Sequence, residues 1–308
     1  MLHDIGHAPF SHVGEDQNVF PEKVNHEDIA INIIKETDIG KIINNNYGAQ
    51  SIERIIFIIT GKTAPVKKQD LLFHDLLSGQ AGIDRMDYLL RDSYFLGVMY
   101  GRFDIERLIE TICFDAEKSF LYWEEGGCHA LEQFLLARYF MFTEVYFHKT
   151  RRSIDYHLGN MIKDYLREHY QIDQLPTVVD EYIRLDDNRV FSWAMTQEKY
   201  YNLFIKRNFF RRIKESSDHA SPDELEFWEK IKEKMQASFS PEDYFIDSAG
   251  KDLYKYEKDE ILVKCENEFL PMHKKSKLIE HLRPLNKRIL YADKSSQQTI
   301  LDILKTLN

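Results

Sequence analysis

The first fifteen residues contain the densest group of chemically active side chains in this 308-residue sequence. They read His3-Asp4-Ile5-Gly6-His7-Ala8-Pro9-Phe10-Ser11-His12-Val13-Gly14-Glu15. Neutral imidazole and carboxylate groups are the ligands that suit a hard-to-borderline divalent metal ion. On a helix, His3 and Asp4 would project about 100° apart, so both could reach one ion. The pattern therefore indicates a metal site at His3 and Asp4.

The second half of this segment favours acid–base chemistry. Pro9 disfavours the helical conformation at Ala8, so we expect a first helix to end there and the chain to turn. His12 and Glu15 are three residues apart and would share one face of a new helix. A carboxylate next to an imidazole orients the ring and raises its basicity, as proton transfer requires.

A single His-Asp pair is weak evidence, because such pairs occur by chance. His74-Asp75 repeats the pair in this chain, and we interpret it as part of an ordinary helix surface or a polar pair in the core. The first segment differs because it has three histidines, with Gly6 and Pro9 fixing the backbone between them.

Two later helical segments carry a polar face and an aromatic stripe. Asp84, Tyr88 and Asp92 follow i, i+4, i+8 spacing on a helix that otherwise buries apolar residues. The alternative for this acidic face is a surface ladder of salt bridges, and we expect Asp87 with Arg91 to be such a structural pair.

The other stripe, on the next long helix, consists of Arg138, Phe142 and Tyr146. Simple core packing is the alternative for this set and would be favoured from spacing alone.

Three blocks together resemble a known family. HDIGHAPFSH, the segment from Gly82 to Asp92 (GIDRMDYLLRD), and Arg138 with Tyr146-Phe147-His148-Lys149 stand in the same order as motifs of the HD-domain phosphohydrolases. Within these, they are similar to the deoxynucleoside triphosphate triphosphohydrolases, which include the bacterial dGTPases and the human sterile-alpha-motif/HD-domain dNTPase. The resemblance covers roughly residues 1–170.

The resemblance implies a role for each matching residue. It implies a divalent metal (Mg, Mn, Fe, Ni or Zn) bound by His3, Asp4 and Asp84. It implies acid–base catalysis by His12, Glu15 and His26. Contacts to the phosphates and sugar of a deoxynucleoside triphosphate would come from His7, at the α-phosphate, and from Arg85, Tyr88, Asp92, Arg138 and Tyr146. It further implies a homo-oligomer, dimer or tetramer, and leaves open a nucleotide activator.

The sequence also departs from the family pattern. Family members have a first metal-binding histidine in an upstream R-F-x-H-S-like helix, whereas this sequence begins two residues before His3. We therefore expect that ligand and its neighbouring arginine to be missing and metal affinity to be reduced. Gly82 also stands where many relatives have aspartate. Two alternatives thus stay open: another HD-type nucleotide phosphohydrolase, such as a nucleotidase or phosphodiesterase, and a catalytically impaired nucleotide-binding regulatory oligomer.

Composition limits the remaining classes. The net charge of −10, from 41 basic and 51 acidic residues, predicts no strong nucleic-acid binding, and a phosphate site must be built locally. The longest apolar run, Ile55–Ile59, is far below the roughly 18 residues of a membrane span. The first residues lack the basic region and apolar stretch typical of a signal peptide, and the three cysteines (Cys113, Cys128, Cys265) suggest no disulfide framework. We expect a cytoplasmic protein without membrane partners.

Apolar spacing predicts a mostly α fold, an HD-domain helical core with a smaller C-terminal α+β region. Expected helices begin at Asn25, Ser51, Asp70 and Ile83, and Cys128 to Tyr170 is expected to form one long helix or two helices joined near Arg151-Arg152. Ile112–Glu124 reads as a hairpin, Asp259–Cys265 and Arg288–Ala292 as strands, and Lys199–Glu215, Pro222–Met235 and Thr299–Leu307 as helices. A shift in composition near residue 170 suggests domains at residues 1–170 and 171–308.

Overall fold

The computed structural model describes residues 2–256 and 260–307, and the chain forms two compact units. The first unit contains residues 1–43, 148–249 and 287–308, and the second contains residues 44–147 and 250–286. Both units use segments from either side of residue 170. The division into domains at residues 1–170 and 171–308 therefore stays a prediction that these units neither follow nor test.

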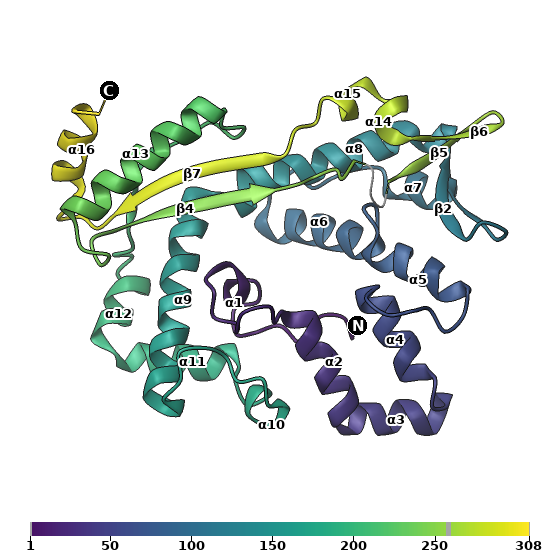
Figure 1. Ribbon diagram of the computed structural model, residues 1–308, viewed down its shortest axis with the longest axis horizontal. Coiled ribbons are helices and arrows are strands. Elements are labelled where there is room, and N and C mark those ends of the chain that lie inside the picture. Colours follow the sequence, from purple (N-terminus) through teal and green to yellow (C-terminus); the bar gives the residue numbers. More distant parts are fainter. Residues whose placement is uncertain (1, 257–259, 308) are drawn as a thin grey trace. The chain divides into compact units, whose positions relative to one another are not determined.

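The first unit is mainly helical with one three-stranded sheet. Its elements are α1 (Val13–Asp16), α2 (His26–Glu36), the start of α3 (Asp38–Tyr47), α9 (Lys149–Tyr170), α10 (Val179–Tyr182), α11 (Asp187–Thr196), α12 (Glu198–Phe204), β3 (Arg211–Glu215), α13 (Pro222–Ser238), most of β4 (Tyr244–Lys251) and β7 (Leu285–Ala292), and α16 (Gln297–Lys305). The sheet has the order β3-β7-β4, and β4 and β7 appear as two long neighbouring arrows in Figure 1.

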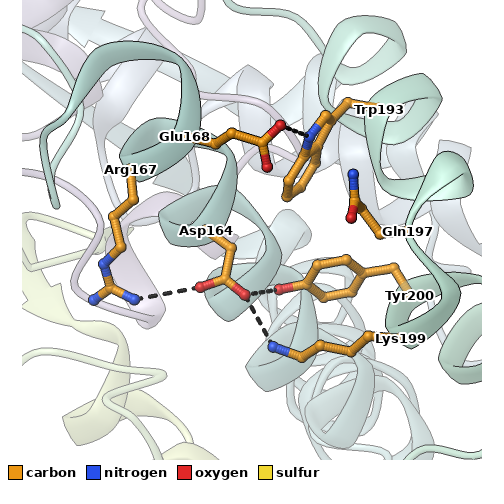
Figure 2. A pocket seen from close by; sticks show the side chains of 7 residues that line it. All are labelled: Asp164, Arg167, Glu168, Trp193, Gln197, Lys199 and Tyr200. Atoms are coloured by element: carbon orange, nitrogen blue, oxygen red, sulfur yellow. Dashed lines mark hydrogen bonds and ion pairs between the residues drawn. The ribbon is translucent and has the colours of Figure 1, made fainter.

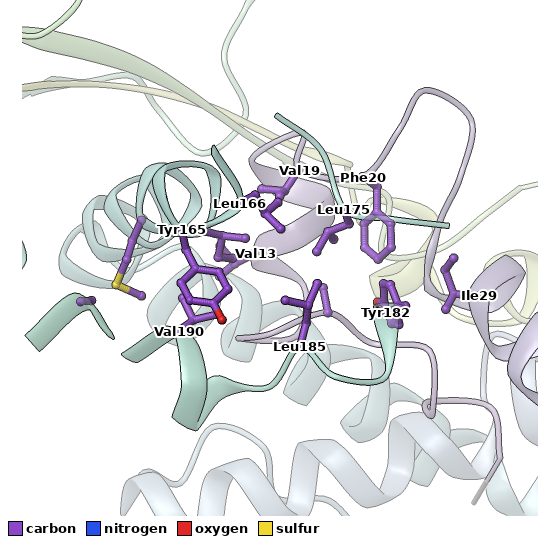
Figure 3. Packing of buried hydrophobic residues seen from close by; sticks show 14 of the residues in the cluster. Val13, Val19, Phe20, Ile29, Tyr165, Leu166, Leu175, Tyr182, Leu185 and Val190 are labelled. Atoms are coloured by element: carbon purple, nitrogen blue, oxygen red, sulfur yellow. The ribbon is translucent and has the colours of Figure 1, made fainter. Parts of the chain in front are cut away.

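Buried apolar side chains hold α1, α2, α9, α10 and α11 together. Val13 and Phe20 from the N-terminal region pack with Tyr165 and Leu166 of α9 and with Tyr182 of α10 (Figure 3). Because this cluster is continuous, the N-terminal segment has a fixed place on the helices of its own unit.

The second unit also combines helices with a small sheet. Its elements are α4 (Ser51–Thr60), α5 (Gln69–Ser78), α6 (Ile83–Leu96), α7 (Ile105–Thr111), β1 (Ile112–Asp115), β2 (Phe120–Glu124), the 3₁₀ turn η1 (Glu125–Gly127), α8 (Cys128–Phe140), the π-helix η2 (Met141–Tyr146), β5 (Leu262–Cys265), β6 (Glu268–Pro271), α14 (Met272–Lys275) and α15 (Lys277–Glu280). In the sheet, which has the order β1-β2-β5-β6, β2 runs parallel to β5.

The mostly α fold class is confirmed, and so are most of the predicted elements. Asn25 caps α2 through a full capping box with Asp28. Helix α4 ends at Gly61, and α6 ends at Gly97, each with a left-handed backbone that glycine adopts without strain. The hairpin predicted for residues 112–124 forms as β1 and β2.

Four expectations about local structure were wrong or incomplete. Residues 3–6 and 9–12 form turns with irregular backbone between them, so no helix ends at Ala8. The long helical region breaks at residues 147–148, after a π-helical segment, and not at Arg151-Arg152. Residues 211–215 form β3 because they pair with β7, which apolar spacing alone does not reveal. Strand β4 was not predicted, and the predicted strand start at Asp259 lies outside the described residues.

Among the described residues, every helix is too short or too polar to cross a lipid bilayer. The three cysteines are free thiols.

Candidate active site

The N-terminal turn brings its histidines against the start of α2. A β-carbon on Gly6 would lie only 2.0 Å from the carbonyl oxygen of His26, so the backbone approaches α2 more closely than any other residue allows. Tyr182 donates a hydrogen bond of 2.6 Å to the carbonyl oxygen of Gly6 and holds the turn in place. The close packing against α2 therefore explains why glycine stands at this position of the His-Asp-x-Gly-His sequence.

Glu15 joins two of the predicted catalytic histidines. One carboxylate oxygen contacts Nδ1 of His12 at 3.2 Å, and the other contacts Nδ1 of His26 at 2.5 Å. The second oxygen also accepts a hydrogen bond of 3.1 Å from the backbone N–H of His26 in the first turn of α2. Because Nδ1 donates to Glu15, Nε2 is the nitrogen of each ring that could accept or deliver a proton.

Glu15 and His26 shift each other's pKa values. Partial burial raises the pKa of Glu15, but hydrogen bonds from His12 and His26 outweigh burial and hold it well below its usual value. Burial lowers the pKa of His26, and the hydrogen bond and charge of Glu15 reverse this effect, so the net shift is upward. Glu15 is therefore ionised at neutral pH and favours the protonated form of His26.

His7 packs between the other two histidines. Its ring stacks on that of His26 with centroids 4.0 Å apart and planes 15° apart, and it meets His12 edge-on at 4.7 Å. One ring nitrogen of each of the three residues lies within 4.8 Å of the others, which is close enough for metal binding. Imidazole lone pairs lie in the ring plane, however, and nearly parallel planes do not converge on one ion. The stacked arrangement suits proton transfer better than a shared metal.

His3 and Asp4 fit a metal site more closely. Nε2 of His3 lies 3.1 Å from a carboxylate oxygen of Asp4, close to the roughly 3 Å that separates adjacent ligands at metal–ligand distances of about 2.1 Å. A hydrogen bond from His7, with help from His3 and His26, holds the pKa of Asp4 below its usual value despite partial burial. An ionised carboxylate beside an imidazole is a donor set for a divalent cation.

The third predicted ligand, Asp84, lies in the first turn of α6 and belongs to the second unit. The complete ligand set His3, Asp4 and Asp84 includes residues of both units and stays a prediction.

Replacing Glu15 by glutamine is expected to lower the pKa of His26, because the charge and hydrogen bond that raise it are lost while burial remains. Because its pKa is raised by folding, protonated His26 stabilises the fold at pH values below its unfolded pKa of about 6.5. This contribution is lost as the pH rises through the pKa of the folded state. The variant should therefore lose stability mainly at acidic pH. NMR titration of labelled histidines measures the shift, and Glu27→Gln, which removes a weaker charge, should cause a smaller one. An unchanged His26 pKa in Glu15→Gln would contradict the described geometry.

In the second unit, the predicted substrate residues gather on α6, α8 and η2. Tyr146 donates a hydrogen bond of 2.7 Å to Asp92, and its ring lies 6.3 Å from that of Tyr88. Burial raises the pKa of Tyr88, so its hydroxyl stays protonated. Asp87 and Arg91 form the exposed i, i+4 pair expected as structural, with contacts of 2.8 and 3.0 Å.

Two arginines from different helices line one cavity of about 50 Å³. Arg85 donates to the carbonyl oxygens of Ser78 and Gly79, the first at 2.7 Å. Arg138 is only 5% exposed and donates to the carbonyl oxygen of Leu253 at 2.8 Å. Burial lowers the pKa of Arg138, although the guanidinium stays charged at neutral pH. These arginines are suited to bind an oxyanion.

Sequence reasoning missed several residues around this cavity, which is also lined by Gln80, Asp252 and Lys255. Asp252 and Lys255 lie far beyond the last predicted motif, and Gln80, which stands just before the motif at Gly82, belongs to no spacing pattern. His74 and Asp75 line the cavity as well, although Nδ1 of His74 is already bonded to the carbonyl oxygen of Ile58 at 3.0 Å.

A larger open hollow of about 420 Å³ in the first unit has a different character (Figure 2). Asp164 contacts Lys199, Tyr200 and Arg167, as the dashed lines show. Trp193 donates to Glu168 at 3.1 Å. Because its charged groups are already paired, this hollow offers no obvious reactive group.

Comparison with known proteins finds a matching family and similar curated proteins. The family described as "HD associated region" matches residues 103–300. The uncharacterized protein YwfO of Bacillus subtilis is 28% identical over 275 residues, covering 82% of this chain and 60% of that protein. A Dictyostelium discoideum protein named deoxynucleoside triphosphate triphosphohydrolase SAMHD1 homolog is 28% identical over 239 residues, covering 73% of this chain and 43% of that protein. The chain thus spans at most about three fifths of the length of these two curated relatives.

Two solved structures share the fold. A hypothetical protein from Aquifex aeolicus has a TM-score of 0.81 and 32% identity, covering 98% of this chain and 78% of that one. A phosphohydrolase from Bacteroides thetaiotaomicron has a TM-score of 0.69 and 24% identity, covering 95% and 78%, and shows the fold alone. The family match extends over more than half of the sequence, and the chain therefore belongs to the family of proteins that carry the HD-associated region.

Proposed function

We propose that this chain is an HD-domain phosphohydrolase that uses a divalent metal to hydrolyse deoxynucleoside triphosphates to deoxynucleoside and triphosphate. The observation that carries the proposal is the group formed by Glu15 with His12 and His26, an ionised carboxylate that holds two imidazoles through their Nδ1 atoms. The name of the Dictyostelium relative supports the choice of substrate.

Each of the predicted site residues would have a defined role in this reaction. A divalent metal bound by His3, Asp4 and Asp84 would polarise the α-phosphoryl group. His12, oriented by Glu15, would transfer the proton, with His26 beside it and His7 at the α-phosphate. Arg85 and Arg138 would bind the anionic triphosphate, and Tyr88, Asp92 and Tyr146 would position the rest of the nucleotide.

The partners and location expected from the sequence belong to the same proposal. We infer a cytoplasmic homo-oligomer, dimer or tetramer, with a nucleotide activator left open. Another HD-type nucleotide phosphohydrolase, or an impaired regulatory oligomer, would replace this function if dNTP turnover were absent.

Asp84→Ala is expected to abolish metal-dependent dNTP turnover, with a loss above the roughly 10–100-fold typical of a residue that only supports a metal ligand. The assay is dNTP hydrolysis with added Mn²⁺, accompanied by elemental analysis of the bound metal. Asp87→Ala is the matched control one turn along α6, because Asp87 is exposed and forms an ion pair with Arg91. Equal activity of wild type and Asp84→Ala would exclude Asp84 as a metal ligand.

A further inference from the structure

The cavity beside Arg85 and Arg138 has a small excess of positive charge. Among the residues that the structure describes, neither guanidinium forms an ion pair with a carboxylate, and both donate to backbone carbonyl oxygens. Nε of Arg138 is buried and has no hydrogen-bond partner among the described residues. A buried donor on a charged group is costly to leave unsatisfied, so it points to a ligand that accepts from it.

A short loop from the C-terminal half of the sequence closes this cavity. Gln80 donates to the carbonyl oxygen of Lys255 at 2.9 Å and accepts from the Lys255 backbone N–H at 2.7 Å. Arg138 holds the same loop through Leu253. Leu253 and Tyr254 are each only 1% exposed, so the loop is anchored in the core of its unit and its position is fixed.

The charges lining the cavity favour an oxyanion of small size. Arg85, Arg138 and Lys255 supply three cations, while Asp75 and Asp252 supply two carboxylates. The small excess of positive charge means that selectivity must come from hydrogen-bond geometry, which planar guanidinium groups provide for phosphate. A volume of about 50 Å³ is far below the 300–1,000 Å³ of a site for a whole drug-sized ligand and suits one tetrahedral group.

We propose that the loop of residues 252–255 completes a phosphoryl-binding pocket with Arg85 and Arg138, and that Lys255 binds the same phosphoryl group as they do. The assignment of that group to the triphosphate of a nucleotide rests on the proposed function. The role of the loop itself rests on the cavity and its contacts.

The test is binding of inorganic triphosphate to the full chain, measured by isothermal titration calorimetry. Lys255→Gln should weaken binding about 5- to 30-fold, as expected for loss of one charge-assisted contact, and should make binding less sensitive to salt. Lys255→Arg should retain most of the affinity. Arg138→Gln should weaken binding further, which shows that the probe occupies this pocket.

Lys274→Gln is the matched control, because Lys274 is an exposed lysine of α14 in the same unit and does not line the cavity. Unchanged triphosphate affinity in Lys255→Gln, or no triphosphate binding by the wild type, would overturn the inference. If Lys255→Gln weakens triphosphate binding while dNTP is cleaved to other products, the pocket stands and the proposed reaction falls. If Arg138→Gln alone weakens binding, the loop has no part in the site and the proposed function is unaffected.

Discussion

His12→Ala is expected to lower the turnover number for dNTP hydrolysis by about 10²–10⁴-fold while KM changes little. The side chain is 59% exposed, and its Nδ1 is held by Glu15 at 3.2 Å, so truncation removes a proton-transfer group without opening the core. A general acid or base acts in the transition state, which separates its effect from that of a residue that binds the substrate. Steady-state kinetics at several pH values measures both parameters.

The chain contains a closely matched control for this substitution. His129 lies three residues before Glu132, with Nδ1 2.8 Å from its carboxylate and a side chain that is 92% exposed. His129→Ala therefore removes the same kind of pair on a helix that carries no predicted catalytic residue. We expect wild-type kinetics from it, and a comparable loss in both variants would remove His12 from the acid–base role.

Arg152→Met is expected to destabilise the protein by about 3–5 kcal/mol. Arg152, which is 7% exposed, donates to both oxygens of Asp247 at 2.8 and 2.7 Å and to Asp16 at 2.7 Å. These contacts join α9 to β4 and to α1, the helix that carries Glu15. Methionine keeps most of the packing volume but leaves the carboxylate of Asp247 buried and uncompensated. Chemical denaturation followed by circular dichroism measures the loss.

Two further variants separate this mechanism from general damage. Arg152→Met combined with Asp247→Leu should recover most of the stability, because the double variant no longer buries the carboxylate of Asp247 without its partner. Lys41→Met removes an exposed i, i+3 partner of Asp38 and should leave the denaturation midpoint unchanged. Failure of the double variant to recover would show that the network matters for more than charge compensation.

Local signals explain which parts of the fold were predictable from the sequence. Asn25, Gly61 and Gly97 mark helix ends through capping and left-handed backbone, which depend on the residue and its neighbours alone. The helix predicted to end at Ala8 is absent because the backbone there depends on α2, against which Gly6 packs, and on Tyr182, 176 residues away in sequence. Strand β3 likewise exists only because β7 pairs with it.

In the candidate site too, contacts between residues close in sequence were predictable and contacts between distant residues were not. His12 with Glu15, and Asp87 with Arg91, were predicted as pairs from spacing, and the structure contains both contacts. The bond from Glu15 to His26 spans eleven residues and two helices, and the contacts of Arg138 and Gln80 with the loop at residues 253–255 span more than a hundred. Such long-range contacts leave no periodic pattern, so the part that Gln80, Asp252 and Lys255 play in the cavity emerged only from the structure.

Identification of the products from a dNTP by ion-exchange chromatography tests the central claim most directly. With Mn²⁺ present, the proposed reaction at the α-phosphorus gives inorganic triphosphate and deoxynucleoside in equal amounts, and both should disappear in Asp84→Ala. Orthophosphate or pyrophosphate together with a nucleotide product would place the attack at a different phosphorus and contradict the triphosphohydrolase assignment.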